Sequence, residues 1–428
     1  MSDQQVRVID ANEVAVDDVP DVAPGSATDL TAGSLPPPLA ERIEPDLAFI
    51  RELRQAGGET LKKCYQCATC SVTCELAPVD RPFPRKEMIW AQWGLKDRLL
   101  ADPDIFLCYQ CNDCSQSCPR GARPGDVLAA LRASVYARFA FPSFMGKALG
   151  NPNAMLALFL VPVAVLFGLL VLQHAGTAEG FGGRMAGLFT ADHVHYHSFL
   201  AHGLLEGLFI AGNVFIFLLA GVGFYRYYDN LRRHHGGPTT MGFGAAVTAT
   251  IKEIVMHRRF TQCGQNRSRS AAHMLVLFGF LGAAATAGLA LGFMLVWMAR
   301  NPGLDFGGIG LANPIKWLGV TSGVALITGS VLMIRRRRLD PDAVGANGFA
   351  DQLFVWMIFV VAATGMLTWM LRLVETPALA YPIYFVHLVA VFFLLWYMPY
   401  SKFSHMIYRA LALSWAHQSA RVEPRPKL

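Results

Sequence analysis

The chain has 428 residues, of which 53% are hydrophobic and only 16% are charged. Soluble domains carry roughly 25% charged residues, so this composition excludes an ordinary soluble protein and indicates a membrane protein with a soluble part. The formal net charge is +6, and because the basic residues gather in loops beside apolar segments, we expect no nucleic-acid partner.

The first segment, residues 1–45, is acidic and rich in Ala, Pro and Asp, without an apolar run of signal-peptide length. Such a composition has too little apolar surface to bury. We therefore expect a disordered tail, and in the absence of a leader we expect the next domain to stay in the cytoplasm.

Eight of the nine cysteines form two copies of the pattern C-x2-C-x2-C-x3-C. In bacterial ferredoxins this run binds [4Fe–4S] clusters, and the fourth cysteine of each copy ligates the other cluster. Structural zinc usually takes two C-x2-4-C pairs, and disulfide frameworks are typical of small secreted domains, so the pattern favours iron over both. The predicted ligands are Cys64, Cys67, Cys70 and Cys118 for one cluster, and Cys108, Cys111, Cys114 and Cys74 for the other.

Residues 46–140 are predicted to form an α-helical ferredoxin domain. The 33 residues between the two cysteine motifs are too many for a compact β-rich ferredoxin, and residues 85–95 have a helical pattern. A second helix is expected to begin near Pro124, with Asp126 as its N-cap.

Six apolar segments follow, each near the ~20 residues that a bilayer requires. They predict a transmembrane domain over residues 150–415. The segments are 154–172, 200–225, 271–299, 316–334, 353–372 and 381–401.

The basic residues between these segments predict the orientation. Loops 226–270 and 335–352 are rich in Arg and Lys, whereas the only such residue in loop 173–199 is Arg184. Cytoplasmic loops carry the excess of basic residues. We therefore expect a multi-pass protein of the cytoplasmic (inner) membrane, with the cluster domain and a C-terminal tail, residues 416–428, on the cytoplasmic side.

Histidines lie in or beside the apolar segments, where ionisable groups are costly and usually functional. His387, near the outer end of the sixth segment, and His405, at its inner end, are 18 residues apart. In a straight helix that is five turns, which places both on one face about 27 Å apart. At matching depths, His202 opens the second segment and His273 opens the third.

Two bis-histidine sites for b-type haems are therefore predicted, His273–His405 and His202–His387. A single interfacial histidine is more often a hydrogen-bonded or snorkelling residue, but two depth-matched pairs favour haem. Three outer-loop histidines compete with His202 for the second site: His193, His195 and His197. The predicted fold is thus all-α, an α-helical ferredoxin domain with two [4Fe–4S] motifs followed by a six-helix transmembrane cytochrome b bundle.

A polar stripe on the second segment predicts a quinone site. Glu206 lies one turn after His202, and Asn213 lies on nearly the same face. A carboxyl group at this depth is costly unless it is paired or neutral, which suits it to exchange protons with a quinone. The alternative is that Glu206 only forms a hydrogen bond to Asn213 or to a group beside the haem.

The segment from His387 to His405 resembles the last span of the respiratory nitrate reductase gamma subunit, in which two haem-ligating histidines flank a turn containing proline, an aromatic and a basic residue. The segment that begins at His273 resembles that family's other proximal ligand. Ala283 stands where the family has a second histidine, so the resemblance does not supply the distal ligand. In that family the quinol site is near the distal haem.

The cysteine domain resembles the C subunit of heterodisulfide reductase, and the whole of about 50–415 resembles the C subunit of the quinone-interacting membrane-bound oxidoreductase. That resemblance implies electron exchange between menaquinone and soluble flavin and iron–sulfur subunits. It also implies a link to adenylylsulfate reductase in dissimilatory sulfur metabolism. No Rossmann fingerprint or P-loop stands out, so flavin and nucleotide sites are expected on other subunits.

Two alternatives remain open. One is the membrane module of a sulfite-reductase-associated or heterodisulfide-reductase-like complex, which is built on similar parts. The other is a non-conducting membrane anchor or redox sensor whose cofactors are structural. Cys263, the ninth cysteine, is interpreted as a plain loop thiol.

Overall fold

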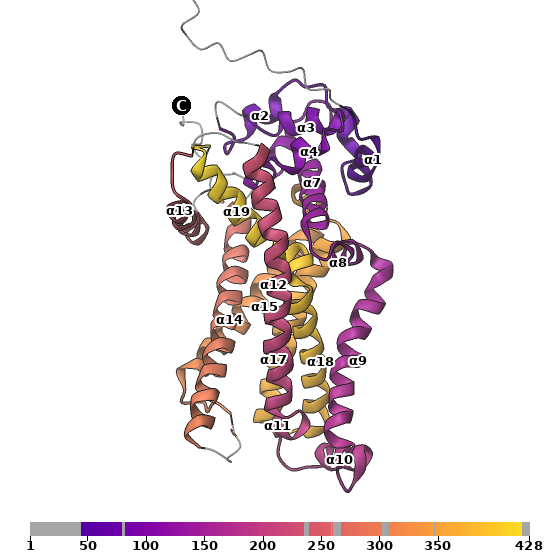
Figure 1. Cartoon of the computed structure of the whole chain (residues 1–428), viewed down its shortest axis with the longest axis vertical. Helices are drawn as coiled ribbons and strands as arrows, with labels where there is room; N and C mark the ends of the chain where they lie inside the picture. The colour runs from indigo at the N-terminus through magenta and orange to yellow at the C-terminus, as the bar shows by residue number, and fades with distance from the viewer. Residues whose placement is uncertain are drawn as a thin grey trace, which may run out of the picture. The chain divides into compact units, whose positions relative to one another are not determined.

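The computed structural model describes most of the chain, and all regular elements of this part are helices (Figure 1). The predicted all-α fold is therefore confirmed. Cys263 and most of the predicted N-terminal tail lie outside the described residues. Those residues are 44–78, 82–234, 239–257, 259, 267–301, 306, 308–345 and 347–421.

Short helices make up the cluster domain. Its core joins apolar side chains from the first, third and longest of them, such as Leu53, Met88 and Leu131, all fully buried. The elements are α1 (Leu47–Gln55), η2 (Glu59–Lys63), α2 (Thr69–Thr73), α3 (Arg85–Gln92), α4 (Lys96–Leu100), α5 (Asp104–Leu107), α6 (Asp113–Gln116), α7 (Pro124–Phe139) and α8 (Ser143–Leu149).

Two helix boundaries differ from the sequence prediction. The helix expected over 85–95 ends at Gln92, because Gly94 adopts a left-handed conformation with φ of 67° that stops the helix. The helix expected near Pro124 begins at that residue, which takes the first helical position. Asp126 is therefore not the N-cap. It lies in the first turn, where its carboxylate accepts a hydrogen bond from Arg123 Nε at 2.6 Å.

Six helices of the described chain are long and apolar enough to cross a membrane, as predicted. Several extend beyond the predicted ends, because residues that leave an apolar layer can still favour helix. The spans are Pro152–His174 (η3, Pro152–Ala154, and α9, Met155–His174), His202–His234 (α12), Arg269–Arg300 (in α14, Arg267–Arg300), Pro314–Leu339 (α15), Phe349–Leu373 (α17) and Pro377–Tyr400 (α18, Pro377–Tyr397, and η5, Met398–Tyr400).

These helices pack in sequence order along the second half of the chain. α14 packs along α15, α15 against α17 and α17 along α18, while α9 and α12 contact α18. Two short helices lie in the loop between α9 and α12: α10 (Gly180–Phe189) and α11 (Tyr196–Phe199). A further short helix, α16 (Pro341–Val344), follows α15.

The sixth span does not continue as one helix to His405. α18 ends at Tyr397, two 3-10 turns follow (η5, and η6, Lys402–Ser404), and α19 (His405–Gln418) begins a new helix. Pro399 has no backbone N–H to continue a helix, and Ser401 is extended with ψ of 178°. The expected five-turn helix is therefore wrong, and His387 lies halfway along α18, not near its outer end.

α19 returns against the cluster domain. Its buried side chains Tyr408 and Trp415 belong to the same core as Phe106 of α5 and Leu131 of α7. α13 (Phe243–Met256) packs against α19, and Thr250 accepts a hydrogen bond from Ser414 at 3.1 Å. This arrangement places the cluster domain directly against the helices that carry the predicted haem histidines.

Candidate redox centres

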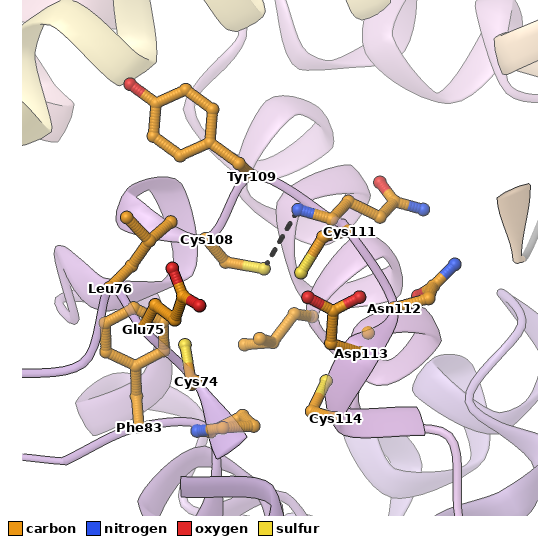
Figure 2. A pocket seen from close by; sticks show the side chains of 14 residues that line it. Cys74, Glu75, Leu76, Phe83, Cys108, Tyr109, Cys111, Asn112, Asp113 and Cys114 are labelled. Atoms are coloured by element: carbon orange, nitrogen blue, oxygen red, sulfur yellow. Dashed lines mark hydrogen bonds between the residues drawn. The ribbon is translucent and has the colours of Figure 1, made fainter. Parts of the chain in front are cut away.

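The eight motif cysteines line two small cavities. Each cavity takes three cysteines from one motif and one from the other, which is the grouping that the spacing predicts. Figure 2 shows the second set, whose sulfur atoms point toward a common space while the ring of Tyr109 points away from it. One cavity is lined by Cys64, Cys67, Cys70 and Cys118, and the other by Cys74, Cys108, Cys111 and Cys114.

The two motifs use the same local backbone geometry. Gln66 and Ala68 in the first copy, and Gln110 and Asn112 in the second, all have positive φ, between 50° and 67°. Left-handed residues on both sides of the second cysteine are uncommon outside tight turns. They turn the chain around the cavity, so that the thiols of one motif converge.

Burial separates the thiols into two kinds. It raises the pKa of the Cys70 thiol to about 11 and that of Cys74 to about 12, and it raises the pKa of Cys114 well above the usual range. A hydrogen bond with the Thr69 hydroxyl lowers the pKa of the exposed Cys67. The buried thiols are protonated at neutral pH in the absence of a metal, so metal binding must release their protons.

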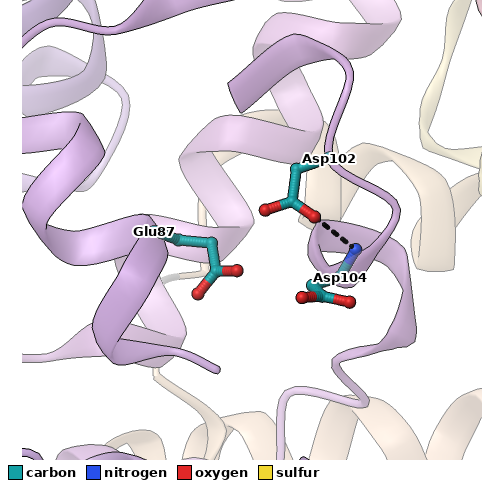
Figure 3. Close-up of side chains that lie close together, drawn as sticks. All are labelled: Glu87, Asp102 and Asp104. Carbon is teal, nitrogen blue, oxygen red and sulfur yellow. Dashed lines mark hydrogen bonds between the residues drawn. The ribbon is translucent and has the colours of Figure 1, made fainter. Parts of the chain in front are cut away.

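A second polar cluster lies beside the cysteines. The buried carboxylates Glu87, Asp102 and Asp104 face one another (Figure 3). Lys86 Nζ lies 2.7 Å from an oxygen of each aspartate, and Arg421 Nε donates to Asp104 at 2.9 Å. Burial also raises the pKa of Glu87, which favours its neutral form. Two cations thus balance the carboxylates, and the cluster fastens the end of the described chain to the cluster domain instead of offering a metal site.

A cavity of about 340 Å³ lies where the membrane helices meet the cluster domain and is lined by both His273 and His405. Its walls are apolar and aromatic, with Phe280, Phe354 and Phe403 among them. An apolar slot with two imidazoles and a cationic rim fits a haem, whose macrocycle needs apolar walls and whose propionates need cations. The cations that line it are Arg132, Arg269, Arg336, Arg337, Lys402 and Arg409.

Each of these two histidines has a hydrogen-bond partner on Nδ1. His405 Nδ1 lies 2.6 Å from the carbonyl oxygen of Lys402, and His273 Nδ1 lies 3.0 Å from Nε2 of His257. A partner on one ring nitrogen orients the other for a metal. The sequence analysis missed His257, because its place depends on how α13 packs and not on any motif.

Two arginines of the haem-site helices hold the loop that carries the second cluster motif. Arg269 donates to the carbonyl oxygens of Tyr109 at 2.7 Å and Gln110 at 3.2 Å. Arg409 donates to the carbonyl of Cys108, and its guanidinium lies 3.8 Å from the centre of the Tyr109 ring. Each arginine is four residues from a predicted haem histidine. Cys108, Tyr109 and Gln110 line both the cysteine cavity and the haem-site cavity.

The predicted outer pair has a different arrangement. His387 Nδ1 lies 3.0 Å from the Thr364 hydroxyl of α17, and its ring fits against Gly365, where a Cβ would lie 2.9 Å from the imidazole. His202 faces Glu206, with 3.4 Å between Nδ1 and Oε1, and its ring stacks near that of His197. The described residues give these two histidines different neighbours, and their pairing stays a prediction.

Comparison with known proteins gives a family model and several relatives. The model of the 4Fe–4S dicluster domain matches residues 60–122. The chain is 37% identical over 108 residues to a protein of Archaeoglobus profundus described as like the C subunit of heterodisulfide reductase, covering 24% of this chain and 57% of that protein. It is 34% identical over 109 residues to the C subunit of the H(2):CoB-CoM heterodisulfide,ferredoxin reductase of Methanothermobacter marburgensis, covering 25% and 57%. The chain thus spans little more than half the length of these two relatives.

One relative extends over the membrane part. Citrate utilization protein B of Escherichia coli is 24% identical over 356 residues, which cover 74% of this chain and 82% of that protein. No solved structure matches the chain significantly. Residues 60–122 are therefore a 4Fe–4S dicluster domain, attached to six apolar helices that fit a multi-pass membrane protein, and the similarities support a role as a redox subunit.

The crossed ligand sets can be tested with pairs of cysteine substitutions. The full chain should hold about eight irons, as two [4Fe–4S] clusters require. Replacing Cys74 and Cys111 with Ala removes two ligands of one predicted cluster, so about four irons should remain. Replacing Cys74 and Cys67 affects both clusters, and iron should fall toward zero. Iron analysis with electron paramagnetic resonance measures this.

Cys263→Ala is the matched control and should keep the full iron content. If the Cys74/Cys111 variant lost both clusters while the Cys74/Cys67 variant kept one, the cysteines of each motif would hold their own cluster, and the crossed assignment would be wrong.

Proposed function

We propose that this chain is the membrane electron-transfer subunit of an oxidoreductase complex. It exchanges electrons between a quinone, such as menaquinone, and soluble flavin or iron–sulfur subunits, through two [4Fe–4S] clusters and two b-type haems. The observation that carries this proposal is the loop Cys108–Gln110, which lines both the second cysteine cavity and the cavity of His273 and His405. One short wall separates the two sites, as electron transfer between them requires.

The loop Cys108–Gln110, which separates the two cavities, suggests the order of the redox centres. Electrons pass between the His273–His405 site and the cluster of Cys108, and then to the cluster of Cys64. The quinone exchanges electrons in the half of the membrane domain away from the clusters, near Glu206 in the second turn of α12. In this scheme the haems supply one-electron chemistry, while the protein supplies the axial imidazoles, the cationic rim and the apolar walls.

The soluble partner distinguishes two versions of this function. The resemblance to the quinone-interacting membrane-bound oxidoreductase favours flavin and iron–sulfur subunits linked to adenylylsulfate reductase. A second candidate is electron transfer that serves the use of citrate or a related carboxylate. It is favoured by the relative that covers most of both chains, which is named for citrate utilization. Both versions share the route from quinone to clusters, whereas a non-conducting anchor or sensor does not.

The haem assignment predicts how spectra respond to histidine substitutions. His273→Ala and His405→Ala should each remove the same low-spin b-haem signal, since each removes an axial ligand of one site. His387→Ala should remove a different signal. Absorption spectra and haem analysis of purified protein measure both.

His234→Ala, an exposed histidine on α12, is the control and should leave both signals in place. Loss of one common haem in all three variants would contradict the two-haem model. An unchanged spectrum in His202→Ala would move the outer ligand to His195 or His197.

The quinone site is proposed near Glu206, at the outer part of α12. Its carboxylate faces His202, with 3.4 Å between Glu206 Oε1 and His202 Nδ1. A row of imidazoles leads from His202 through His197 to His195, with ring centres 6.1 and 5.5 Å apart, toward the exposed outer loop. Protons released by a quinol at Glu206 can pass to His197 and His195, whereas His202, as a proposed haem ligand, is not itself an acceptor.

Glu206→Gln should slow the reduction of the haems by a menaquinol analogue about a hundredfold, the range of a lost general acid–base group. Spectra of the dithionite-reduced protein should not change. Stopped-flow absorption measures the rate. Glu179→Gln, an exposed glutamate of the outer loop, is the control. Quinol kinetics equal to those of the control would place the quinone elsewhere.

The cluster of Cys64 is proposed as the exit to the soluble partner. Cys67 is exposed, and beside it Tyr65 and Val72 are exposed by 68% and 71%. Arg120 lies 4.2 Å from the centre of the Tyr65 ring. Exposed aromatic and arginine side chains are the residues that most often anchor protein interfaces. The exposed charges around this rim are Lys62, Lys63, Arg85 and Arg120, against Glu59 and Glu75.

The cationic excess at this rim predicts a partner with an acidic face. Replacing Lys62, Lys63 and Arg120 with Glu should slow oxidation of the reduced clusters by ferricyanide, an anion, about tenfold at low ionic strength and should speed oxidation by a cationic cobalt(III) complex. Both effects should disappear in high salt. An acidic [2Fe–2S] ferredoxin serves as a protein probe of the same sign as ferricyanide.

Glu substitutions at Arg138 and Lys147, exposed residues of α7 and α8, provide the control. They are compared with Glu substitutions at Lys62 and Arg120, so that both variants change the charge by −4. Equal effects in both variants would show that only the net charge matters and would remove the reason to place the partner at this rim.

A further inference from the structure

His257 contacts His273 and is not among the residues that line the cavity of His273 and His405. Its Nε2 is 3.0 Å from His273 Nδ1, and the two ring centres are 5.2 Å apart. The other ring nitrogen of His257 lies 3.4 Å from the carbonyl oxygen of Val255. His257 is only 6% exposed.

With both imidazoles neutral, as iron binding by His273 requires, these contacts assign the hydrogens to particular nitrogens. The carbonyl of Val255 can only accept, so Nδ1 of His257 is the donor and its Nε2 has the lone pair. Nε2 of His257 must then accept from Nδ1–H of His273. The lone pair of His273 is therefore on Nε2, the nitrogen that can bind iron from within the cavity.

The two proposed axial ligands are thus oriented by different acceptors. His405 Nδ1 donates to a backbone carbonyl, that of Lys402, at 2.6 Å. His273 Nδ1 donates to an imidazole. An acceptor on Nδ1–H makes an imidazole a more basic ligand, and a more basic ligand stabilises ferric over ferrous iron.

The backbone holds His257 in this position. His257 is the C-cap of α13 and has φ of 50°. This left-handed conformation is rare for residues other than glycine, although His and Asn adopt it more often than most. α13 packs along α19, the helix that begins at His405, so His257 is held relative to both proposed ligands.

We propose that His257 is a positioning residue that fixes the tautomer of His273 and lowers the potential of the haem at the His273–His405 site. This inference rests on the proposed function, since it needs a haem there. In this inference His257 acts on the haem only through its hydrogen bond with His273. His257 itself does not ligate iron.

Two variants that differ by one methylene group test this role. His257→Asn suits the left-handed backbone, but its shorter side chain leaves the amide oxygen out of reach of His273. In His257→Gln the amide oxygen extends further and can accept from His273 Nδ1–H. Redox titration of the purified full chain, followed by haem absorption, gives the potential of each variant, and electron paramagnetic resonance gives the ferric low-spin signal.

His257→Asn should keep the haem and shift its potential upward. Losing the group that accepts a hydrogen bond from a ligating histidine typically changes metal binding by about tenfold. If the preference for ferric over ferrous haem falls tenfold, the potential of this one-electron couple rises by about 59 mV. His257→Gln should have a potential close to that of the wild type, because its amide oxygen can accept from His273 Nδ1–H. The potential of the haem that depends on His387 should not move in either variant, which serves as the internal control.

The outcomes separate this inference from the proposed function. If His273→Ala kept the full haem content, the haem site itself would be wrong. If His273→Ala lost the haem but His257→Asn had the wild-type potential and ferric signal, only the role of His257 would be overturned. Loss of that haem in both His257 variants, as in His273→Ala, would make His257 a ligand and would also overturn the inference.

Discussion

The arrangement of the redox centres depends on how two arginines hold the loop Cys108–Gln110. The carbonyl groups of this loop are enclosed between the cluster domain and the membrane helices, and buried carbonyls need donors. Arg269 and Arg409 supply them, and hydrogen bonds to charged groups contribute about 1.5–3 kcal/mol each. Because both arginines also line the cavity of His273 and His405, the same side chains hold one cluster motif and form part of the cationic rim of the proposed haem site.

The break after α18 makes this arrangement possible. If the helix had continued straight through Pro399, the residues after His405 would have extended along the axis of α18. The chain instead begins α19 at His405, and Figure 1 shows α19 inclined to α18. α19 can then place Arg409 against the cluster loop and Trp415 in the core of the cluster domain. A short turn at the membrane surface thus joins the soluble and membrane parts into one folded unit.

The sequence alone predicted the features that repeat or that composition determines. Cysteine spacing predicted the two sets that line the cavities, because in this ligand pattern the fourth cysteine of each motif belongs to the other cluster. Apolar length predicted all six membrane helices. The predicted straight helix from His387 to His405 is wrong, because Pro399 cannot donate the backbone hydrogen bond that would continue the helix. His257, Arg269 and Arg409 belong to no motif, and their roles appear only once α13, α14 and α19 pack together.

The two cluster cavities have different surroundings: one lies beside the membrane helices and the other is partly exposed. The cavity of Cys108 is lined by the backbone of the loop Cys108–Gln110, which Arg269 and Arg409 of the membrane helices hold, and by the half-buried Cys74. The cavity of Cys64 has an exposed cysteine, Cys67, and an exposed aromatic and cationic rim. The cavity of Cys64 therefore faces solution, whereas the cavity of Cys108 lies toward the helices that carry His273 and His405. Each cavity takes one cysteine from the other motif, so neither motif can form its cavity without the other.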